Sequence, residues 1–127
     1  MKNKKKMRIV DILKKKRENE QRRILTDINR LVMEKDKVKE IVIELKSFLE
    51  GMSEKKDIND LYFIKTRSFY QKKIIDDINT MNNRIEFIDN ELVNMKKRCA
   101  NLEIVKKELS KKSDLFKNEL RESRELI

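Results

Sequence analysis

Hydrophobic residues recur along the chain at alternating steps of three and four residues, in two long runs that break around the single glycine, Gly51. A seven-residue repeat sustained over many turns is typical of helices that supercoil around each other. The first run comprises Met7, Val10, Ile24, Ile28, Leu31, Val38, Val42, Leu45, Leu49 and Met52. The second comprises Ile64, Ile74, Ile78, Met81, Ile85, Ile88, Leu92, Met95, Cys99, Leu102, Leu109, Phe116 and Leu120.

The two runs predict an all-α chain of one domain, in which two long helices form an antiparallel coiled-coil hairpin. The first helix is expected over about residues 3–50, the turn over about 51–57 and the second helix over about 58–124. Gly51 suits the C-terminal cap of the first helix, because glycine tolerates the left-handed conformation of that position. Asp57 or Asn59 can cap the second helix by accepting a bond from a free backbone amide.

Polar residues interrupt both runs at repeat positions. Lys14, Arg17 and Gln21 lie between Val10 and Ile24 in the first run. Polar core positions cost stability but fix register and partner number. Two interpretations of this stretch stay open: it packs loosely, or it faces a different protein.

The second run weakens after Leu102, where Lys106 and Ser113 occupy repeat positions. This weakening predicts that the end of the longer second helix is unpaired in the free protein. The register is not specified by the pattern. Leu31 gives a plausible apolar layer with either Ile78 or, one heptad later, Ile85.

The composition excludes several classes of chemistry. The chain has no His, one Cys and one Gly, so a histidine-based catalytic or metal site, a zinc cluster and a glycine-rich phosphate loop are all excluded. Carboxylate pairs such as Asp76-Asp77 and Asp89-Glu91 would be solvated on an exposed helix, with no cause for shifted acidity. Cys99 lies at a core position, where it is interpreted as a small apolar residue and not as a reactive thiol. We therefore expect no enzyme activity and no cofactor.

No apolar stretch approaches the ~18 residues of a membrane span, and the basic start lacks the apolar run of a signal peptide, so we expect a cytoplasmic protein. The net charge of +10 is unevenly placed, because residues 1–23 hold eleven Lys or Arg against three acids. A hairpin would bring this basic start beside the basic residues 96–127. Three kinds of partner fit a basic end: an acidic protein cavity, nucleic acid or an anionic membrane surface. We prefer the acidic protein cavity, and the alternative without a partner is a frayed, solvated tail.

Four aromatic residues gather at the start of the second helix. They are Tyr62, Phe63, Phe69 and Tyr70, and they point in several directions around a helix. They have two interpretations: they thicken the core at the tip of the hairpin with Phe48 opposite, or they form an exposed docking patch.

This layout of a basic chain, a shorter first helix, aromatic residues at 61–64 and 68–71 and a charged C-terminal helix resembles the central-stalk proteins of type III secretion systems. These form the FliJ/YscO family, which includes EscO-like proteins of injectisomes. The resemblance implies a hairpin whose paired termini bind in the pore of a hexameric secretion ATPase. It implies that the opposite tip reaches the export gate, a membrane protein, and that the chain also handles substrate chaperones.

Carried over by position, the resemblance implies an ATPase-binding end comprising Lys4, Lys5, Lys6, Arg8, Lys14, Lys15, Lys16, Arg17, Lys111 and Lys112. It implies a gate-binding tip comprising Tyr62, Phe63, Phe69 and Tyr70. The expected protein is a monomer when isolated, peripheral to the inner-membrane apparatus, neither inserted in the membrane nor bound to nucleic acid. Two other hypotheses stay open: a parallel homodimeric coiled-coil scaffold, and a basic helical rod that binds nucleic acid.

Overall fold

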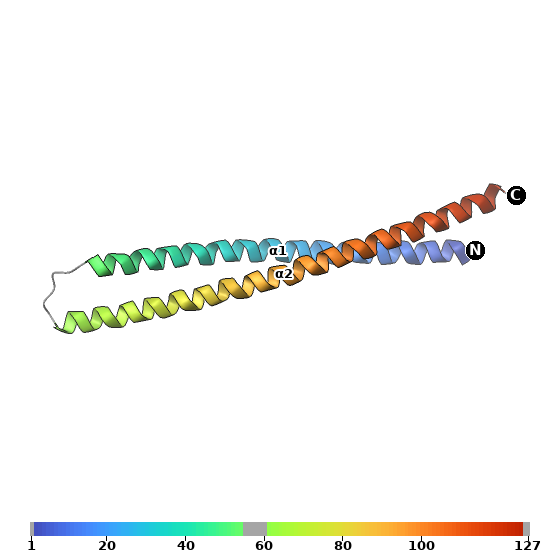
Figure 1. The fold of residues 1–127 in the computed structure, drawn as a ribbon. Helices are drawn as coiled ribbons and strands as arrows, with labels where there is room; N and C mark the ends of the chain where they lie inside the picture. Colours follow the sequence, from blue (N-terminus) through green and yellow to red (C-terminus); the bar gives the residue numbers. More distant parts are fainter. Residues whose placement is uncertain (1, 55–60, 126–127) are drawn as a thin grey trace. The chain divides into compact units, whose positions relative to one another are not determined.

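The computed structural model consists of two long helices, α1 (Lys2–Glu54) and α2 (Leu61–Glu125), which pack against each other (Figure 1). The structure describes residues 2–54 and 61–125. The prediction of an all-α chain with two packed helices is therefore confirmed. The expected caps Asp57 and Asn59 lie outside the described residues.

Helix α1 continues through Gly51 and ends at Glu54, whereas the pattern predicted an end near residue 50. Gly51 is helical and its φ is not positive, so its prediction as a left-handed cap is wrong. A Cβ added to Gly51 would meet nothing within 4 Å, so no close approach requires a glycine there. The helix passes through because the apolar repeat continues beyond it at the half-buried Met52, and one glycine costs a helix only about 1 kcal/mol.

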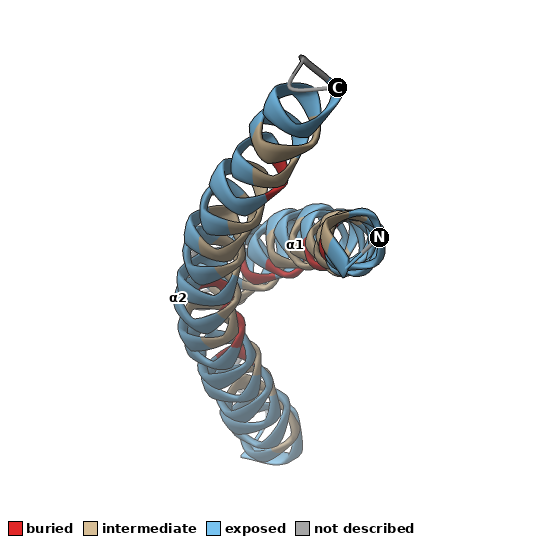
Figure 2. Ribbon diagram, turned by 90° about the vertical axis from the view of Figure 1, so that its right-hand side faces the viewer, coloured by how far each residue is buried: buried red, intermediate tan, exposed pale blue. Residues whose placement is uncertain are grey.

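The chain divides into two compact units, each built from a part of both helices. Unit 1 comprises residues 1–29 and 93–127, and unit 2 comprises residues 30–92. In both units the buried and half-buried residues follow one side of each helix, which we call the seam, and the other sides are exposed (Figure 2).

Unit 2 has the more apolar seam. Its buried hydrophobic side chains are Val38, Val42, Ile78, Ile88 and Leu92, all of them repeat positions, and Ile88 is completely buried. One repeat residue of this unit departs from the pattern, because Ile64 is 40% exposed. The last turns of α1, at Phe48 and Met52, lie beside Tyr70, so α2 has less of α1 to pack against near Ile64.

Two polar pairs fix the register in unit 2. Arg84 donates from Nε to Oε1 of Glu34 over 2.9 Å, and Lys35 forms an ion pair with Asp89. Residues 34–35 thus face residues 84–89. In an antiparallel pair, Leu31 opposite Ile78 or Ile85 would instead place residues 34–35 opposite residues near 75 or 82. The pairings of Leu31 with Ile78 or Ile85 do not fit these contacts.

Unit 1 has fewer buried apolar side chains. Val10 and Ile24 of α1 are buried, and the only buried polar side chain among the described residues is Ser113 of α2. The repeat residues of α2 in this unit are half-buried, namely Met95, Cys99, Leu102, Leu109, Phe116 and Leu120. The expected core position of Cys99 thus corresponds to a half-buried free thiol on the seam.

Candidate interaction surfaces

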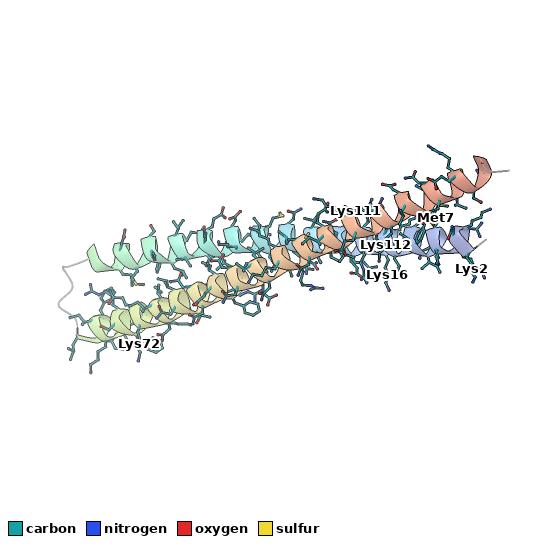
Figure 3. The ribbon with its side chains drawn as sticks, turned by 45° about the vertical axis from the view of Figure 1, so that its right-hand side comes forward. Lys2, Met7, Lys16, Lys72, Lys111 and Lys112 are labelled. Carbon is teal, nitrogen blue, oxygen red and sulfur yellow. The ribbon has the colours of Figure 1, made fainter. Side chains whose placement is uncertain are left out.

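The positive charge of the protein belongs to unit 1. Its described residues include twenty-one Lys or Arg and ten Asp or Glu, a net charge of +11, whereas those of unit 2 include ten and eleven, a net charge of −1. Both helices contribute to the basic surface of unit 1, for example through Lys2 and Lys16 of α1 and Lys111 and Lys112 of α2 (Figure 3).

Most of the basic residues singled out from the sequence are exposed. The exposed ones are Lys4, Lys5, Lys6, Arg8, Lys15, Lys16, Lys111 and Lys112. Lys14 and Arg17 differ, because they are half-buried at repeat positions of the seam. Eight of the ten candidates are thus available to an anionic partner, and the other two are half-buried on the seam.

A polar cluster joins the helices in the middle of unit 1. Gln21 donates from Nε2 to Oε2 of Glu103 over 2.9 Å, and its Oε1 accepts a bond from Nζ of Lys106 over 3.0 Å. Lys106 also lies 3.7 Å from the Glu103 carboxylate. The hydrogen bond from Gln21, and then the nearby charge of Lys106, lower the pKa of Glu103 below its ordinary value of 4.5. Gln21 therefore has its partners on α2 of the same chain and needs none from another protein.

A second polar contact lies closer to the ends of the chain. Oγ of Ser113, a residue that is only 3% exposed, donates to Oδ1 of Asp11 over 2.9 Å. Lys106 and Ser113 are the two residues that predicted an unpaired end of α2, and both of them contact α1. At these two positions the prediction is wrong, because a small hydroxyl and a long ammonium side chain find hydrogen-bond acceptors on α1. Residues 121–124, in the last turn of α2, are exposed.

The seam is open beside Arg17. This guanidinium donates from Nη1 to both carboxylate oxygens of Glu20, over 3.0 and 3.2 Å, on its own helix. A cavity of about 270 Å³ adjoins it and is lined by Arg17, Glu20, Arg98, Asn101, Leu102 and Val105. Of the two interpretations of the polar stretch, loose packing therefore fits Arg17. Gln21 fits neither of them, because it pairs with α2 of the same chain.

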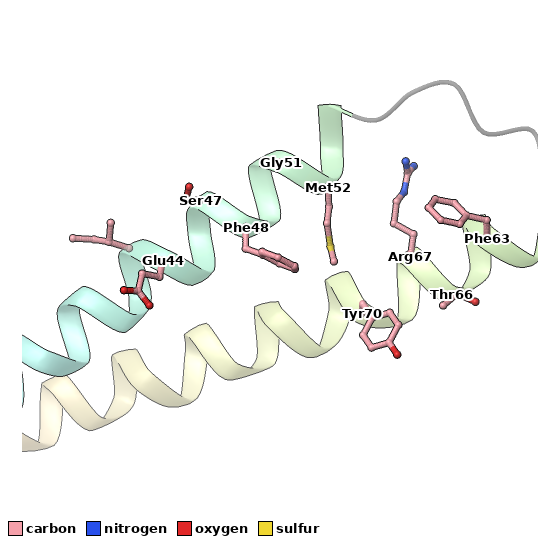
Figure 4. Close-up of a pocket in the computed structure, with 10 residues that line it drawn as sticks. Glu44, Ser47, Phe48, Gly51, Met52, Phe63, Thr66, Arg67 and Tyr70 are labelled. Carbon is pink, nitrogen blue, oxygen red and sulfur yellow. The ribbon is translucent and has the colours of Figure 1, made fainter.

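In unit 2, a groove of about 770 Å³ lies between the last turns of α1 and the first turns of α2 (Figure 4). Phe48 and Met52 extend from α1 toward α2, and Arg67 extends from α2 toward α1. Phe63 and Tyr70 line the groove, whereas Tyr62 and Phe69 lie outside it. The groove is lined by Ile43, Glu44, Ser47, Phe48, Gly51, Met52, Phe63, Thr66, Arg67 and Tyr70.

The aromatic residues do not build a closed core. Phe63 is 38% exposed and Tyr70 is 50% exposed, while Tyr62, Phe69 and Phe48 are more exposed still. The rings of Phe69 and Tyr70 meet edge to face, with centroids 5.8 Å apart. Their exposure agrees with the interpretation as a docking patch. Ile43 also lines the groove, and the seven-residue repeat did not predict this because Ile43 lies outside the repeat. An exposed apolar residue outside a repeat could have indicated a second surface.

The described parts of the chain hold no cluster of three or more potential metal ligands. Within the same residues, neither helix contains a segment apolar enough to cross a bilayer. Of the carboxylate pairs considered above, Asp76 and Asp77 are exposed, and Asp89 forms its ion pair with Lys35.

Comparison of the chain with models of protein families, with curated proteins and with solved structures finds no match in any of the three.

Proposed function

We propose that this chain is a non-enzymatic central-stalk component of a type III protein secretion apparatus. In this role it binds and stimulates the hexameric secretion ATPase and links it to the export gate and to substrate chaperones. It acts in the cytoplasm, peripheral to the inner-membrane apparatus, and is a monomer when isolated. The observation that carries the proposal is the concentration of all the net positive charge in unit 1, whereas unit 2 is almost neutral and has an aromatic groove.

The proposal requires an antiparallel coiled-coil hairpin, and contacts within each unit support one. In unit 1, a step of ten residues forward on α1, from Asp11 to Gln21, matches a step of ten residues back on α2, from Ser113 to Glu103. In unit 2, residues 34–35 face residues 84–89, and residues 45–52 share a cavity with residues 70–77. The seven-residue repeat of the seam supports the coiled coil.

Unit 1 is the part that we assign to the ATPase. Its exposed cations favour a partner surface that is rich in carboxylates, and such complementarity speeds association and fixes orientation. A ring of six equivalent subunits cannot contact two unequal helices in the same way six times. If the chain binds a nucleotide-competent arrangement of the ring more tightly than the other arrangements, it shifts the ring toward that arrangement. ATP hydrolysis then increases although the chain supplies no catalytic group.

The aromatic groove of unit 2 is the part that we assign to the export gate. A groove of this size with aromatic and methionine walls fits the apolar face of a partner helix or loop. Phe63 and Tyr70 are the anchors within the groove. Tyr62 and Phe69 are exposed outside it, and the ring of Phe69 contacts that of Tyr70.

The test measures ATP hydrolysis by the purified hexameric secretion ATPase of the same cell, with and without this chain. A variant with Lys4, Lys5 and Lys6 all changed to Glu should lose most of the stimulation. The matched control changes Lys65, Lys72 and Lys73 of unit 2 to Glu, which alters the net charge by the same amount, and should keep it. Equal stimulation by both variants and the unaltered chain would contradict the assignment of unit 1 to the ATPase.

Sedimentation separates the stalk from the homodimeric scaffold. The seam residues Gln21, Lys106 and Ser113 of unit 1 find hydrogen-bond partners within one chain, which supports self-pairing and a particle of 15.4 kDa. A particle of twice that mass would favour the scaffold. Tight binding to duplex DNA at physiological salt would favour the nucleic-acid-binding rod, since weak binding there is the expectation for a protein partner.

A further inference from the structure

The first turns of α1 are apolar on two sides. Met7 and Val10 lie on the seam, half-buried and buried respectively. Ile9, Ile12 and Leu13 are 56%, 67% and 38% exposed, so α2 does not cover them. Their spacing of three and four residues places them on one face of the helix.

Cations surround these three residues. Exposed neighbours along the helix are Lys5, Lys6, Arg8, Lys15 and Lys16. Lys2 and Lys16 point away from α2, and Met7 points toward it (Figure 3). We call the apolar residues Ile9, Ile12 and Leu13, together with Lys5, Lys6, Arg8, Lys15 and Lys16, the outer face.

The acidic side chains near the outer face are paired. Asp11 accepts the hydrogen bond of Ser113 on the seam side, and Glu20, which lines a cavity with Ile12, Lys15 and Lys16, accepts hydrogen bonds from Arg17. The charge presented around Ile9, Ile12 and Leu13 is therefore positive.

We propose that the outer face binds the surface of an anionic phospholipid membrane. The aliphatic side chains enter the boundary between headgroups and acyl chains, and the lysine stems extend along it so that their ammonium groups reach the lipid phosphates. The proposal goes beyond the stalk function and does not depend on it, because it concerns the free chain and a lipid surface.

The three exposed aliphatic side chains favour a membrane over other anionic partners of the free chain. A carboxylate-rich protein surface would pair with the cations but offers no apolar contact to Ile9, Ile12 and Leu13. Nucleic acid would use the cations, but its phosphates have no use for exposed isoleucine and leucine side chains. The combination of aliphatic centre and lysine rim is the composition of helices that lie on membranes.

The binding should be shallow and reversible, because only three aliphatic side chains take part. It should need anionic lipid, and raising the ionic strength from about 0.05 M to about 0.5 M should weaken it by roughly tenfold or more. Vesicles of phosphatidylcholine alone should retain almost none of the protein.

The experiment is vesicle flotation with phosphatidylcholine containing about 30% phosphatidylglycerol, using the full chain. The key variant is Ile12→Ser, which removes aliphatic area without altering charge. Its matched control is Ile43→Ser, since Ile43 lies on the same helix in unit 2 and has the same 67% exposure. Ile12→Ser should lower the partition coefficient about fivefold or more, and Ile43→Ser should change it by less than about twofold.

Circular dichroism should show the same helicity and unfolding for both variants, because both side chains are exposed. Flotation of Ile12→Ser equal to that of the unaltered chain overturns the proposal. Absence of flotation, combined with retention on duplex DNA that is insensitive to Ile12→Ser, overturns it in favour of nucleic acid. Absence of flotation, combined with binding to the secretion ATPase that Ile12→Ser weakens, assigns the outer face to a protein and leaves the stalk function standing.

Discussion

Replacing Ile88 by Ala tests whether the seam of unit 2 holds the helices together. Ile88 is 0% exposed, and among the described residues it is the only fully buried side chain. The change removes three buried carbons at about 0.8 kcal/mol each, or about 2.4 kcal/mol, and the remaining cavity adds to this loss. The higher helix propensity of Ala returns about 0.4 kcal/mol. We expect the free energy of unfolding to fall by about 2–3 kcal/mol, at the lower end of the usual range, because a two-helix seam can relax around the gap.

The assay is urea unfolding followed by the helical circular-dichroism signal. Ile75→Ala is the matched control, since Ile75 lies on the same helix in the same unit and is 45% exposed. It should lose less than about 1 kcal/mol, because its side chain is already half in water. A loss for Ile88→Ala no larger than that for Ile75→Ala would refute the packing of the two helices through this side of α2.

Three further predictions concern the glycine, the polar cluster and the two seams. Gly51→Ala should stabilise the protein by up to about 1 kcal/mol in thermal unfolding, because Gly51 is helical with free space around it. Destabilisation would instead indicate that Gly51 has the left-handed conformation of a helix cap. The lowered pKa of Glu103 means that its contribution to stability is present above its ordinary pKa of 4.5 and is lost as pH falls below that value; unfolding measured against pH should show this loss in the unaltered chain and a smaller one in Glu103→Gln. Hydrogen exchange should be faster for residues 2–29 than for residues 35–50, because unit 1 has fewer buried apolar side chains; equal protection would argue against the difference between the seams.

The repeat predicted the packed sides of both helices well, because hydrophobic spacing directly determines which side of a helix is covered. The positions around Gly51 were predicted less well. A glycine next to a polar segment favours a helix end by local chemistry alone, but the half-buried Leu49 and Met52 on either side of it continue the seam. The register could not be predicted, since shifting one helix by a heptad replaces each apolar layer by another. The polar pairs of Lys35 with Asp89 and Glu34 with Arg84 select one register, and such pairs depend on side-chain reach.

The candidate surfaces were predicted in part. The distribution of charge along the sequence predicted the basic unit, because runs of Lys and Arg can be identified without knowing how the helices pack. It did not separate Lys14 and Arg17, which belong to the seam, from the exposed lysines around them. The pairing of Ser113 with Asp11 was missed because their approach depends on the register, and a buried serine looks like a gap in an apolar pattern. The groove combines Phe48 and Met52 with Phe63 and Tyr70 from the other helix, so neither helix alone reveals it.

The excess of cations in unit 1 has a consequence for handling the protein. Like charges crowded on two adjoining helices repel each other, and this repulsion weakens as dissolved ions shorten the range of the field, to about 8 Å at physiological ionic strength. Added electrolyte should therefore increase the stability of unit 1 and decrease its affinity for any anionic partner. A buffer of high ionic strength thus suits storage of the purified chain, whereas binding assays call for low ionic strength.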